Sequence, residues 1–110
     1  MQGLVKQVLL QGLEELQRIV PDIRKVYVAG NTTMLHLFLN VDCSSIGVAP
    51  YTPAFLESRT ATGEQLGLQG IGTVVSLPNI AAFVGADLVA GLNCVAMPAD
   101  GKYSLLVDLG

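Results

Sequence analysis

The sequence predicts an α/β fold in which helices pack on a short, mostly parallel sheet. Apolar residues recur with helical spacing over residues 3–20, and two β-branched runs, 25–29 and 73–78, are each followed by a turn and a helical pattern. Of the 110 residues, 51% are hydrophobic. Strands that alternate with helices are typical of parallel sheets. We expect residues 1–110 to form a single partial domain, because this length allows one core at most.

The first helix is expected over residues 3–20. Its apolar residues fall on one face and its polar residues on the other. Glu14 and Arg18 are spaced for a favourable ion pair, and Pro21 ends the helix. Packing on a sheet is the expected role, and binding of a partner is the alternative.

The strand 25–29 leads into a glycine, three small polar residues and a helix over 32–39. One of Asn31, Thr32 and Thr33 is expected to cap this helix. Ligands also gather where strands end and helices begin, so the same residues could face a ligand. His36 lies among apolar neighbours. A packed imidazole bonded to backbone is favoured over a proton carrier or ligand.

Residues 41–69 are expected to form a long irregular insertion. The segment 49–55 is pinned in an extended conformation by two prolines, residues 60–64 form a loop, and residues 65–68 could form a short strand. Tyr51 and Phe55 are expected to close the edge of the sheet. Such insertions commonly carry function or cover a neighbouring module.

After the strand 73–78, Asn79 is expected to cap a helix over residues 80–97. A stripe of small residues along this helix would let another backbone approach closely. Asp87 is the only charge in the helix. It could face solvent, or the nucleotide or metal side of a cleft. Residues 104–110 read as another buried strand, and the missing turn after it predicts that the chain is a piece of something larger.

Composition argues against several classes of partner and site. The net charge is −3 and the six basic residues form no cluster, which disfavours nucleic acid and anionic membranes. Cys43 and Cys94 are far apart and there is one histidine, so a Cys/His metal site is not expected and both thiols should be free. No run reaches the length of a membrane helix, and no signal peptide is recognised. We expect a cytoplasmic protein.

Four motifs follow one another in the chain: VAGNTTM at 28–34, PYTPAF at 50–55, LPNI at 77–80 with FVGAD at 83–87, and LLVDLG at 105–110. Spacing alone suggests phosphate or Mg²⁺ chemistry and no more. In this order, however, the motifs resemble the C-terminal ATPase region of the reductive activators of corrinoid proteins. The fold implied is part of an RNase H-like, actin-like ATPase lobe.

The resemblance implies an ATP-driven activator that returns cob(II)alamin to cob(I)alamin on methyl-transfer proteins. Its cofactors would be ATP and Mg²⁺, with a [2Fe–2S] cluster in a separate domain of the parent protein. Asp108 would be catalytic and would hold Mg²⁺. Nucleotide binding would fall to residues at strand ends and turns, namely Gly30, Asn31, Thr32, Thr33, Gly85, Asp87 and Gly110.

The implied partners are a corrinoid protein and the remaining lobes of the parent chain. The first phosphate motif, the adenosine glycines and the cluster cysteines are absent from these residues, so the chain alone is expected to be inactive. Its excess apolar surface predicts self-association. Two alternatives remain open: a docking lobe that holds a corrinoid protein through residues 41–69, and part of a related kinase or activator of the actin-like superfamily.

Overall fold

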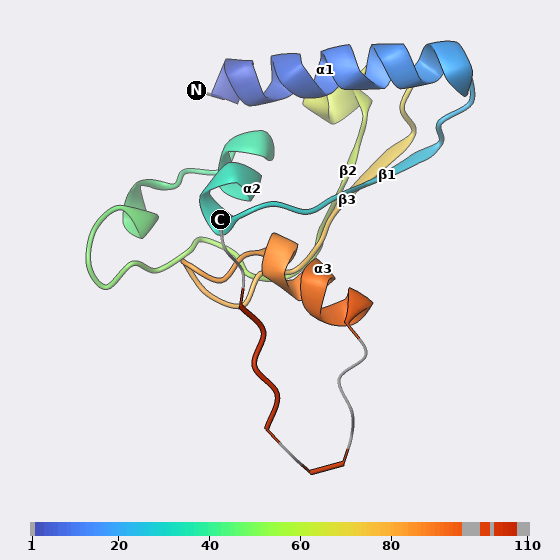
Figure 1. Cartoon of the computed structure of the whole chain (residues 1–110). Coiled ribbons are helices and arrows are strands. Elements are labelled where there is room, and N and C mark those ends of the chain that lie inside the picture. Colours follow the sequence, from blue (N-terminus) through green and yellow to red (C-terminus); the bar gives the residue numbers. More distant parts are fainter. Residues whose placement is uncertain (1, 96–99, 102, 108–110) are drawn as a thin grey trace.

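The computed structural model of the chain describes residues 2–95, 100–101 and 103–107. Figure 1 shows the helices arranged around a small sheet. In chain order the elements are α1 (Gln2–Ile19), β1 (Lys25–Val28), α2 (Thr32–Phe38), the 3₁₀ turn η1 (Ser44–Ile46), β2 (Arg59–Thr62), the 3₁₀ turn η2 (Glu64–Leu66), β3 (Thr73–Ser76) and α3 (Ala86–Cys94). The α/β class is therefore confirmed, as are the first two helices and the strands that begin at residues 25 and 73.

The sheet is mixed, with strand order β1-β3-β2. β1 pairs with β3 in parallel, so that Val26 lies opposite Val74. β2 pairs with the other side of β3 in the antiparallel direction. The prediction of a mostly parallel sheet is wrong on this point. β2 was expected to be loop, because its sequence, Arg-Thr-Ala-Thr, has little apolar content and lies on an edge where only one neighbour supports it.

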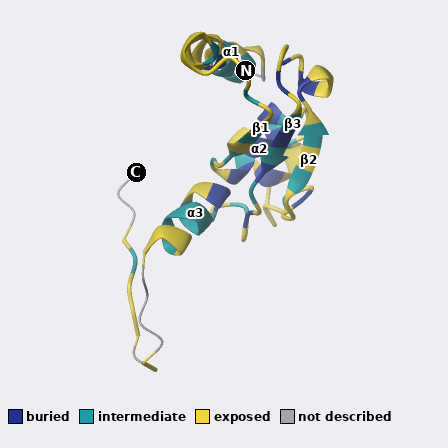
Figure 2. Ribbon diagram, turned by 90° about the vertical axis from the view of Figure 1, so that its right-hand side faces the viewer, coloured by how far each residue is buried: buried dark blue, intermediate teal, exposed yellow. Residues whose placement is uncertain are grey.

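Two clusters of buried side chains form the core, and α2 contributes to both. The larger cluster joins α1 and α2 to the sheet and to the segment before β3, through Leu13, Phe38, Leu66, Leu68, Ile71 and Val74. The smaller one joins α2 to the insertion and to α3, through Leu35, Phe55 and Ala86. Figure 2 shows the buried residues concentrated around the sheet and α2. α2 is therefore the element on which the rest of the chain packs.

The chain around η2 is a tight turn, and the possible strand at residues 65–68 is wrong. Leu66 belongs to the 3₁₀ turn, and Gly67 follows in the left-handed region with φ 73°. Gly63 is packed so closely that a β-carbon there would lie 2.1 Å from the Ile71 carbonyl oxygen. Glycine at position 63 lets the turn fold back onto the start of β3.

α3 begins at Ala86, six residues later than the sequence predicts, and it ends at Cys94. Residues before it form a tight turn closed by a β-bridge between Ala81 and Val84. Asn79 does not cap a helix at residue 80. Its side chain instead accepts a hydrogen bond from the amide of Ala86 at 3.0 Å, across seven residues. The predicted cap therefore serves the real helix start from a distance.

The expected strand at 104–110 is not formed over its described part. Leu105 is 87% exposed and Val107 is 64% exposed, and residues 103–107 have no strand pairing. Residues 108–110 lie outside the described residues. Residues 103–107 have the apolar content of a strand, but no described residue pairs with them. No helix among the described residues is long and apolar enough to cross a membrane.

Candidate functional site

The structure brings the corner after β1 into contact with the corner before α3. The amide of Ala86 donates to the carbonyl oxygen of Gly30 at 3.0 Å as well as to Asn79 Oδ1. Gly85 is buried, and a β-carbon on it would lie 2.6 Å from the Asn31 Cα atom and 2.8 Å from the Gly30 carbonyl oxygen. Only glycine allows the two backbones to approach this closely.

Most polar atoms of this corner are used within the fold. Asn31 caps α2, because its Oδ1 atom accepts a hydrogen bond from the amide of Met34 at 2.9 Å. The buried Thr32 hydroxyl donates to the carbonyl of Ala81 at 2.7 Å and ties α2 to the turn before α3. The predicted cap is confirmed. The hydroxyl of Thr32 is thus used in a hydrogen bond to Ala81, which lies 49 residues further along the chain.

Asp87 lies exposed in the first turn of α3, where a carboxylate complements the helix dipole. Its Oδ1 atom accepts a hydrogen bond from the amide of Leu88 at 2.9 Å. Asp108 and Gly110 were predicted as the catalytic, metal and phosphate-turn residues, and they lie outside the described residues. Within the described part of the chain, no group of three or more His, Cys, Asp or Glu side chains could hold a metal ion.

Whether this corner suits a nucleotide depends on the polar atoms that remain. Among the described residues, no hydrogen bond within the chain uses the amide nitrogen of Asn31, the hydroxyl of Thr33 or the second carboxylate oxygen of Asp87. A β-carbon at Gly30 would make ordinary van der Waals contact with Met34 and Leu35, at 3.8 and 3.9 Å. These three polar groups at the rim are therefore not used within the described fold, whereas Gly85 and the Thr32 hydroxyl serve it.

Asn79 is an exception to the pairing of buried polar atoms in this region. The residue is only 6% exposed and its Oδ1 atom is bonded, but its Nδ2 atom has no hydrogen-bond partner among the described residues. A buried donor left unpaired costs about 1–3 kcal/mol. The orientation of the Asn79 side-chain amide is therefore set by its Oδ1 atom, which accepts the hydrogen bond from the Ala86 N–H.

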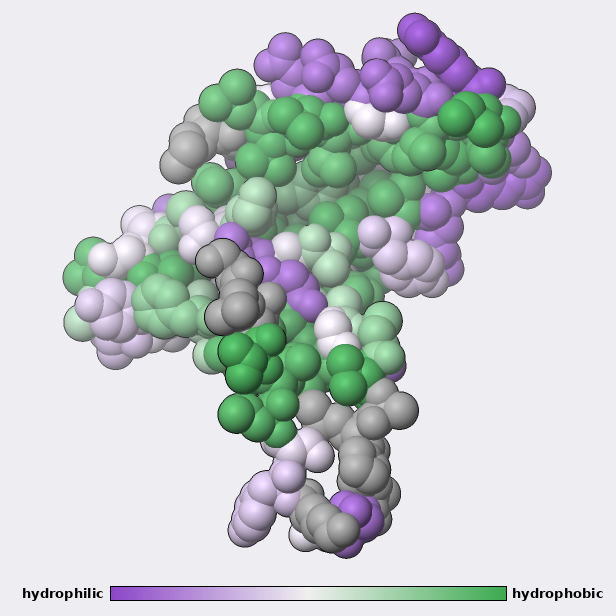
Figure 3. Space-filling model, in the orientation of Figure 1, coloured by the Kyte–Doolittle hydropathy of each residue, from purple (hydrophilic) through white to green (hydrophobic). Residues whose placement is uncertain are grey.

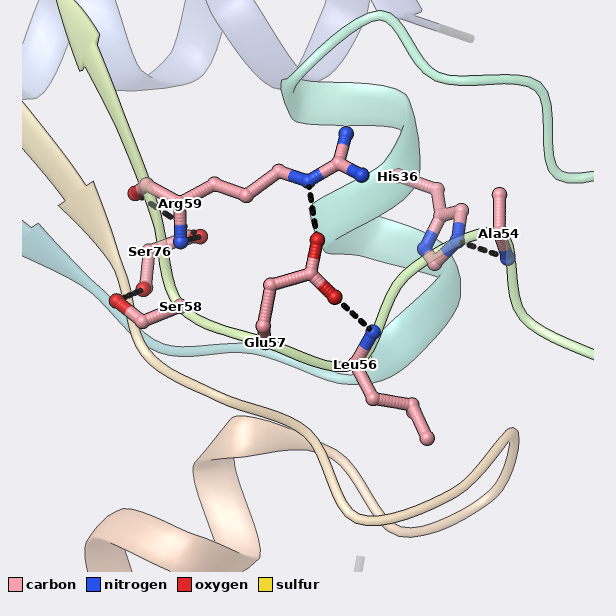
Figure 4. Close-up of polar contacts among 7 residues, drawn as sticks. All are labelled: His36, Ala54, Leu56, Glu57, Ser58, Arg59 and Ser76. Carbon is pink, nitrogen blue, oxygen red and sulfur yellow. Dashed lines mark hydrogen bonds and ion pairs between the residues drawn. The ribbon is translucent and has the colours of Figure 1, made fainter.

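His36 fastens the insertion to α2. It is completely buried, its Nδ1 atom lies 2.7 Å from the Thr32 carbonyl oxygen, and its Nε2 atom accepts a hydrogen bond from the amide of Ala54 at 3.1 Å. Figure 4 shows the imidazole directed at the Ala54 amide. Since Nε2 accepts, Nδ1 must carry the proton and donate to Thr32, so the ring is the neutral Nδ1–H tautomer. The predicted packed imidazole is confirmed.

A stack of side chains extends from His36 to the surface. The Phe55 ring lies 4.3 Å from the His36 ring and nearly parallel to it, and the Arg59 guanidinium lies 4.1 Å from the Phe55 centroid on this ring. Arg59 also pairs with Glu57 at 3.1 Å. The pKa of Glu57 is lowered by hydrogen bonding to its own backbone amide and by Arg59. Phe55 is therefore buried between His36 and Arg59, in the cluster that joins α2 to α3, and its expected place at the sheet edge stays a prediction.

Ser76, at the end of β3, was not singled out by the sequence. It is completely buried, and its hydroxyl accepts from the Arg59 amide at 3.1 Å and lies 3.3 Å from the Arg59 carbonyl oxygen. Its own carbonyl accepts from Ser58 at 2.7 Å. Figure 4 shows these bonds joining β2 to β3. A serine that ends a β-branched run was the only sequence signal for this joint.

Tyr51 behaves differently from Phe55. It is 46% exposed, and its ring packs edge-on against Phe83, with 5.5 Å between ring centroids. Phe83 itself is 74% exposed. The prediction that Tyr51 plugs the sheet edge is therefore wrong. The two rings, which we call the aromatic pair, come from the insertion and from the turn before α3.

An apolar groove of about 370 Å³ lies beside the corner. It is bounded by the first half of α1, including Leu4 and Val8, and by the end of β1 and the start of α2, including Gly30 and Met34. Leu4 and Val8 are 65% and 68% exposed. Figure 3 shows hydrophobic atoms on the side of α1 that faces the rest of the chain and hydrophilic atoms along its outer side.

The chain is similar to a described protein family, to a curated protein and to a solved structure. Residues 2–100 match the family model described as the RACo middle region. The chain is 36% identical over 91 residues to the corrinoid activation enzyme RamQ of Eubacterium limosum, a match that covers 81% of the chain and 15% of that protein. It also superposes on a solved reductive activator for corrinoid, iron–sulfur protein with a TM-score of 0.65 and 34% identity, covering 73% of the chain and 14% of that structure. The chain thus spans about one seventh of the length of these relatives.

Proposed function

The chain belongs to the RACo middle region family, and from this premise we propose that it forms part of an ATP-dependent reductive activator of corrinoid proteins. The observation that carries the proposal is the pair of relatives whose names state corrinoid activation, at 36% and 34% identity. Both matches cover most of this chain. The activity proposed belongs to a longer protein that includes these residues.

We place the chain within the actin-like ATPase portion of that protein, as the four sequence motifs suggest. The match to the model of the middle region supports membership of the family. The place of these residues within the ATPase portion is our proposal. The parent would bind ATP and Mg²⁺ and would carry a [2Fe–2S] cluster in another domain. We also propose a cytoplasmic location for it.

Within this chain, Asn31, Thr33 and Asp87 would contact the nucleotide from the rim of the corner. The Asn31 amide and Thr33 hydroxyl would donate to oxygen atoms of the ligand, since neither group is used within the fold. ATP hydrolysis would supply the free energy for a reduction that is otherwise unfavourable. Gly30 and Gly85 would set the spacing of the two loops, and Asp108 and Gly110 would extend the site toward Mg²⁺ and phosphate.

Reconstitution with purified components tests the proposal. The longer protein is mixed with a low-potential electron donor and a corrinoid protein in the cob(II)alamin state, and visible absorption follows formation of cob(I)alamin. We expect formation only with Mg-ATP present. Equal reduction without ATP would remove the ATP-dependent part of the proposal, and no reduction in either case would overturn it.

A second candidate function is favoured by one observation, the exposed aromatic pair. In this alternative the chain is a docking lobe that holds the corrinoid protein and contacts no nucleotide. Isothermal titration of the 110-residue chain separates the two roles. Binding of the corrinoid protein without binding of Mg-ATP favours docking, and saturable binding of Mg-ATP favours a nucleotide contact.

A further inference from the structure

His36 connects three segments of the chain through hydrogen bonds. Its Nε2 atom accepts from the Ala54 amide of the insertion at 3.1 Å, and its Nδ1 atom lies 2.7 Å from the Thr32 carbonyl oxygen in α2. The Thr32 hydroxyl continues the connection, because it donates to the Ala81 carbonyl in the turn before α3 at 2.7 Å. The insertion is therefore connected through α2 to the corner where α3 begins.

The hydrogen bond from Ala54 requires a neutral ring. A proton on Nε2 would turn this acceptor into a donor, and two N–H groups would then face each other across the 3.1 Å that separates Nε2 from the Ala54 nitrogen. The ring is also completely buried, so water does not solvate an added charge. Protonation of His36 is therefore incompatible with the contact that holds Ala54.

The charged groups on the insertion side do not compensate a positive ring. The Arg59 guanidinium lies 4.1 Å from the centroid of Phe55, whose other neighbour in the stack is the imidazole at 4.3 Å. The two oxygens of Glu57 are directed at Arg59 and at the Leu56 amide, as Figure 4 shows. A charge on the imidazole would thus have a like charge beyond Phe55.

The other elements around α2 offer no compensating carboxylate either. Asp42, which follows α2, is exposed and bonds to Ser44, and Asp87 in α3 is exposed and bonds to its neighbour Leu88. α1 faces α2 with apolar side chains. Among the described residues, no hydrogen bond or ion pair joins the His36 ring to a carboxylate.

We propose that the hydrogen bond between Ala54 and His36 is a pH-sensitive latch, which holds the insertion on α2 and opens when the ring is protonated. A histidine side chain in water titrates at about pH 6.5. The open form takes up a proton that the closed form excludes, so opening becomes more favourable as the pH falls below about 6.5. This inference does not depend on the proposed function.

Opening of the latch reaches beyond the insertion. Phe55, the residue after Ala54, packs with Leu35 and Ala86 in the smaller core cluster. Ala86 is the first residue of α3, and its amide bonds to Gly30. Proton uptake at His36 therefore loosens the packing of α3 against the corner.

Hydrogen exchange of the longer protein, followed by mass spectrometry, tests the latch. After correction for the intrinsic pH dependence of exchange, protection of peptides that cover residues 50–56 should fall about tenfold or more from about pH 7 to about pH 5. Peptides that cover residues 63–68 are the control, because that turn is closed by its own backbone bonds and contains no histidine. Their protection should stay unchanged over the same range.

Two variants identify the group that titrates. His36→Gln has no ionisable ring, so protection of residues 50–56 should no longer depend on pH, whatever its absolute value. Glu57→Gln is the matched control in the same segment and should keep the wild-type dependence. The pKa of Glu57 is lowered by hydrogen bonding to its own backbone amide and by Arg59, so this carboxylate stays ionised over the range tested.

The wild-type comparison decides the proposal even where His36→Gln does not fold. Protection of residues 50–56 that does not change with pH, or an equal loss in residues 63–68, would overturn the latch. The same conclusion would follow if a folded His36→Gln variant kept the pH dependence or if Glu57→Gln abolished it.

Discussion

Gly85 lies so close to Asn31 that a β-carbon on Gly85 would stand 2.6 Å from the Asn31 Cα atom. The obstacle is backbone, which cannot rotate away. Gly85→Ala should therefore destabilise the fold by about 2 kcal/mol or more, measured by urea denaturation. Gly91→Ala, inside α3, is the control for a glycine that caps the same helix, because a β-carbon at Gly91 meets nothing within 4 Å. It should be neutral or stabilising, and equal losses in both variants would contradict the close contact.

The tautomer of His36 can be tested directly. ¹⁵N NMR of the imidazole should show the proton on Nδ1, as required by the bonds to Thr32 and Ala54. His36→Leu fills the site with an apolar side chain but leaves the Ala54 amide without its acceptor, so it should cost about 2 kcal/mol. A spectrum of the Nε2–H tautomer would show that the hydrogen-bond assignment is wrong.

The cap of α2 gives a smaller effect. Asn31→Ala removes the acceptor for the Met34 amide and should lower the free energy of unfolding by about 1 kcal/mol. Asn31→Asp keeps an acceptor oxygen and should restore most of that loss. If the aspartate variant were as unstable as the alanine variant, the side-chain cap would not be the stabilising contact.

Asp42 offers a test of local electrostatics. Its pKa is lowered chiefly by the hydrogen bond from the Ser44 hydroxyl, at 2.6 Å, and next by the Ser44 amide. Ser44→Ala should raise this pKa toward the ordinary value. Because the folded pKa is depressed, the carboxylate contributes stability above its unfolded pKa, and this contribution is lost as the pH falls through the folded pKa. NMR titration of the Asp42 carboxyl carbon measures this pKa in the wild type and in Ser44→Ala. An unchanged pKa in the variant would count against the hydrogen bond.

Self-association of the 110-residue chain is expected from the exposed apolar side chains of α1. Leu4 and Val8 border the groove at 65% and 68% exposure. The double variant Leu4→Gln with Val8→Gln should reduce association, as light scattering at high concentration would show, because it removes apolar area from this surface. The same changes at Glu14 and Glu15, both already exposed and polar, serve as the control. A monomeric wild-type chain would contradict the expectation.

Local pattern predicted the parts of the fold that local interactions determine. The helical spacing of residues 3–20 identified α1, and the polar residues after Gly30 identified the cap at Asn31. The parts that were wrong depend on distant partners. α3 starts at Ala86 because its first amide bonds to Gly30, and β2 exists because β3 supplies its hydrogen bonds. The spacing of apolar residues in α3 and in β2 does not show which distant segment will supply their hydrogen bonds.

The candidate site shows the same division. The stripe of small residues that includes Gly85 predicted a close backbone approach, and the structure brings Gly85 against the loop of Gly30 and Asn31. The sequence could not show that the Thr32 hydroxyl is occupied by Ala81, or that Phe83 pairs with Tyr51. Both contacts join segments more than thirty residues apart, and each depends on how the turn before α3 closes.

Among the strands that the structure describes, the order β1-β3-β2 leaves β1 paired on one side only. The other side of β1 presents backbone N–H and C=O groups that no described strand pairs, and such an edge can accept a further strand. Gly30 follows β1 after one residue, and its carbonyl accepts the first amide of α3, so the end of this edge strand is tied to the start of α3. A strand added beside β1 would therefore lie next to the corner where Gly30 and Ala86 meet.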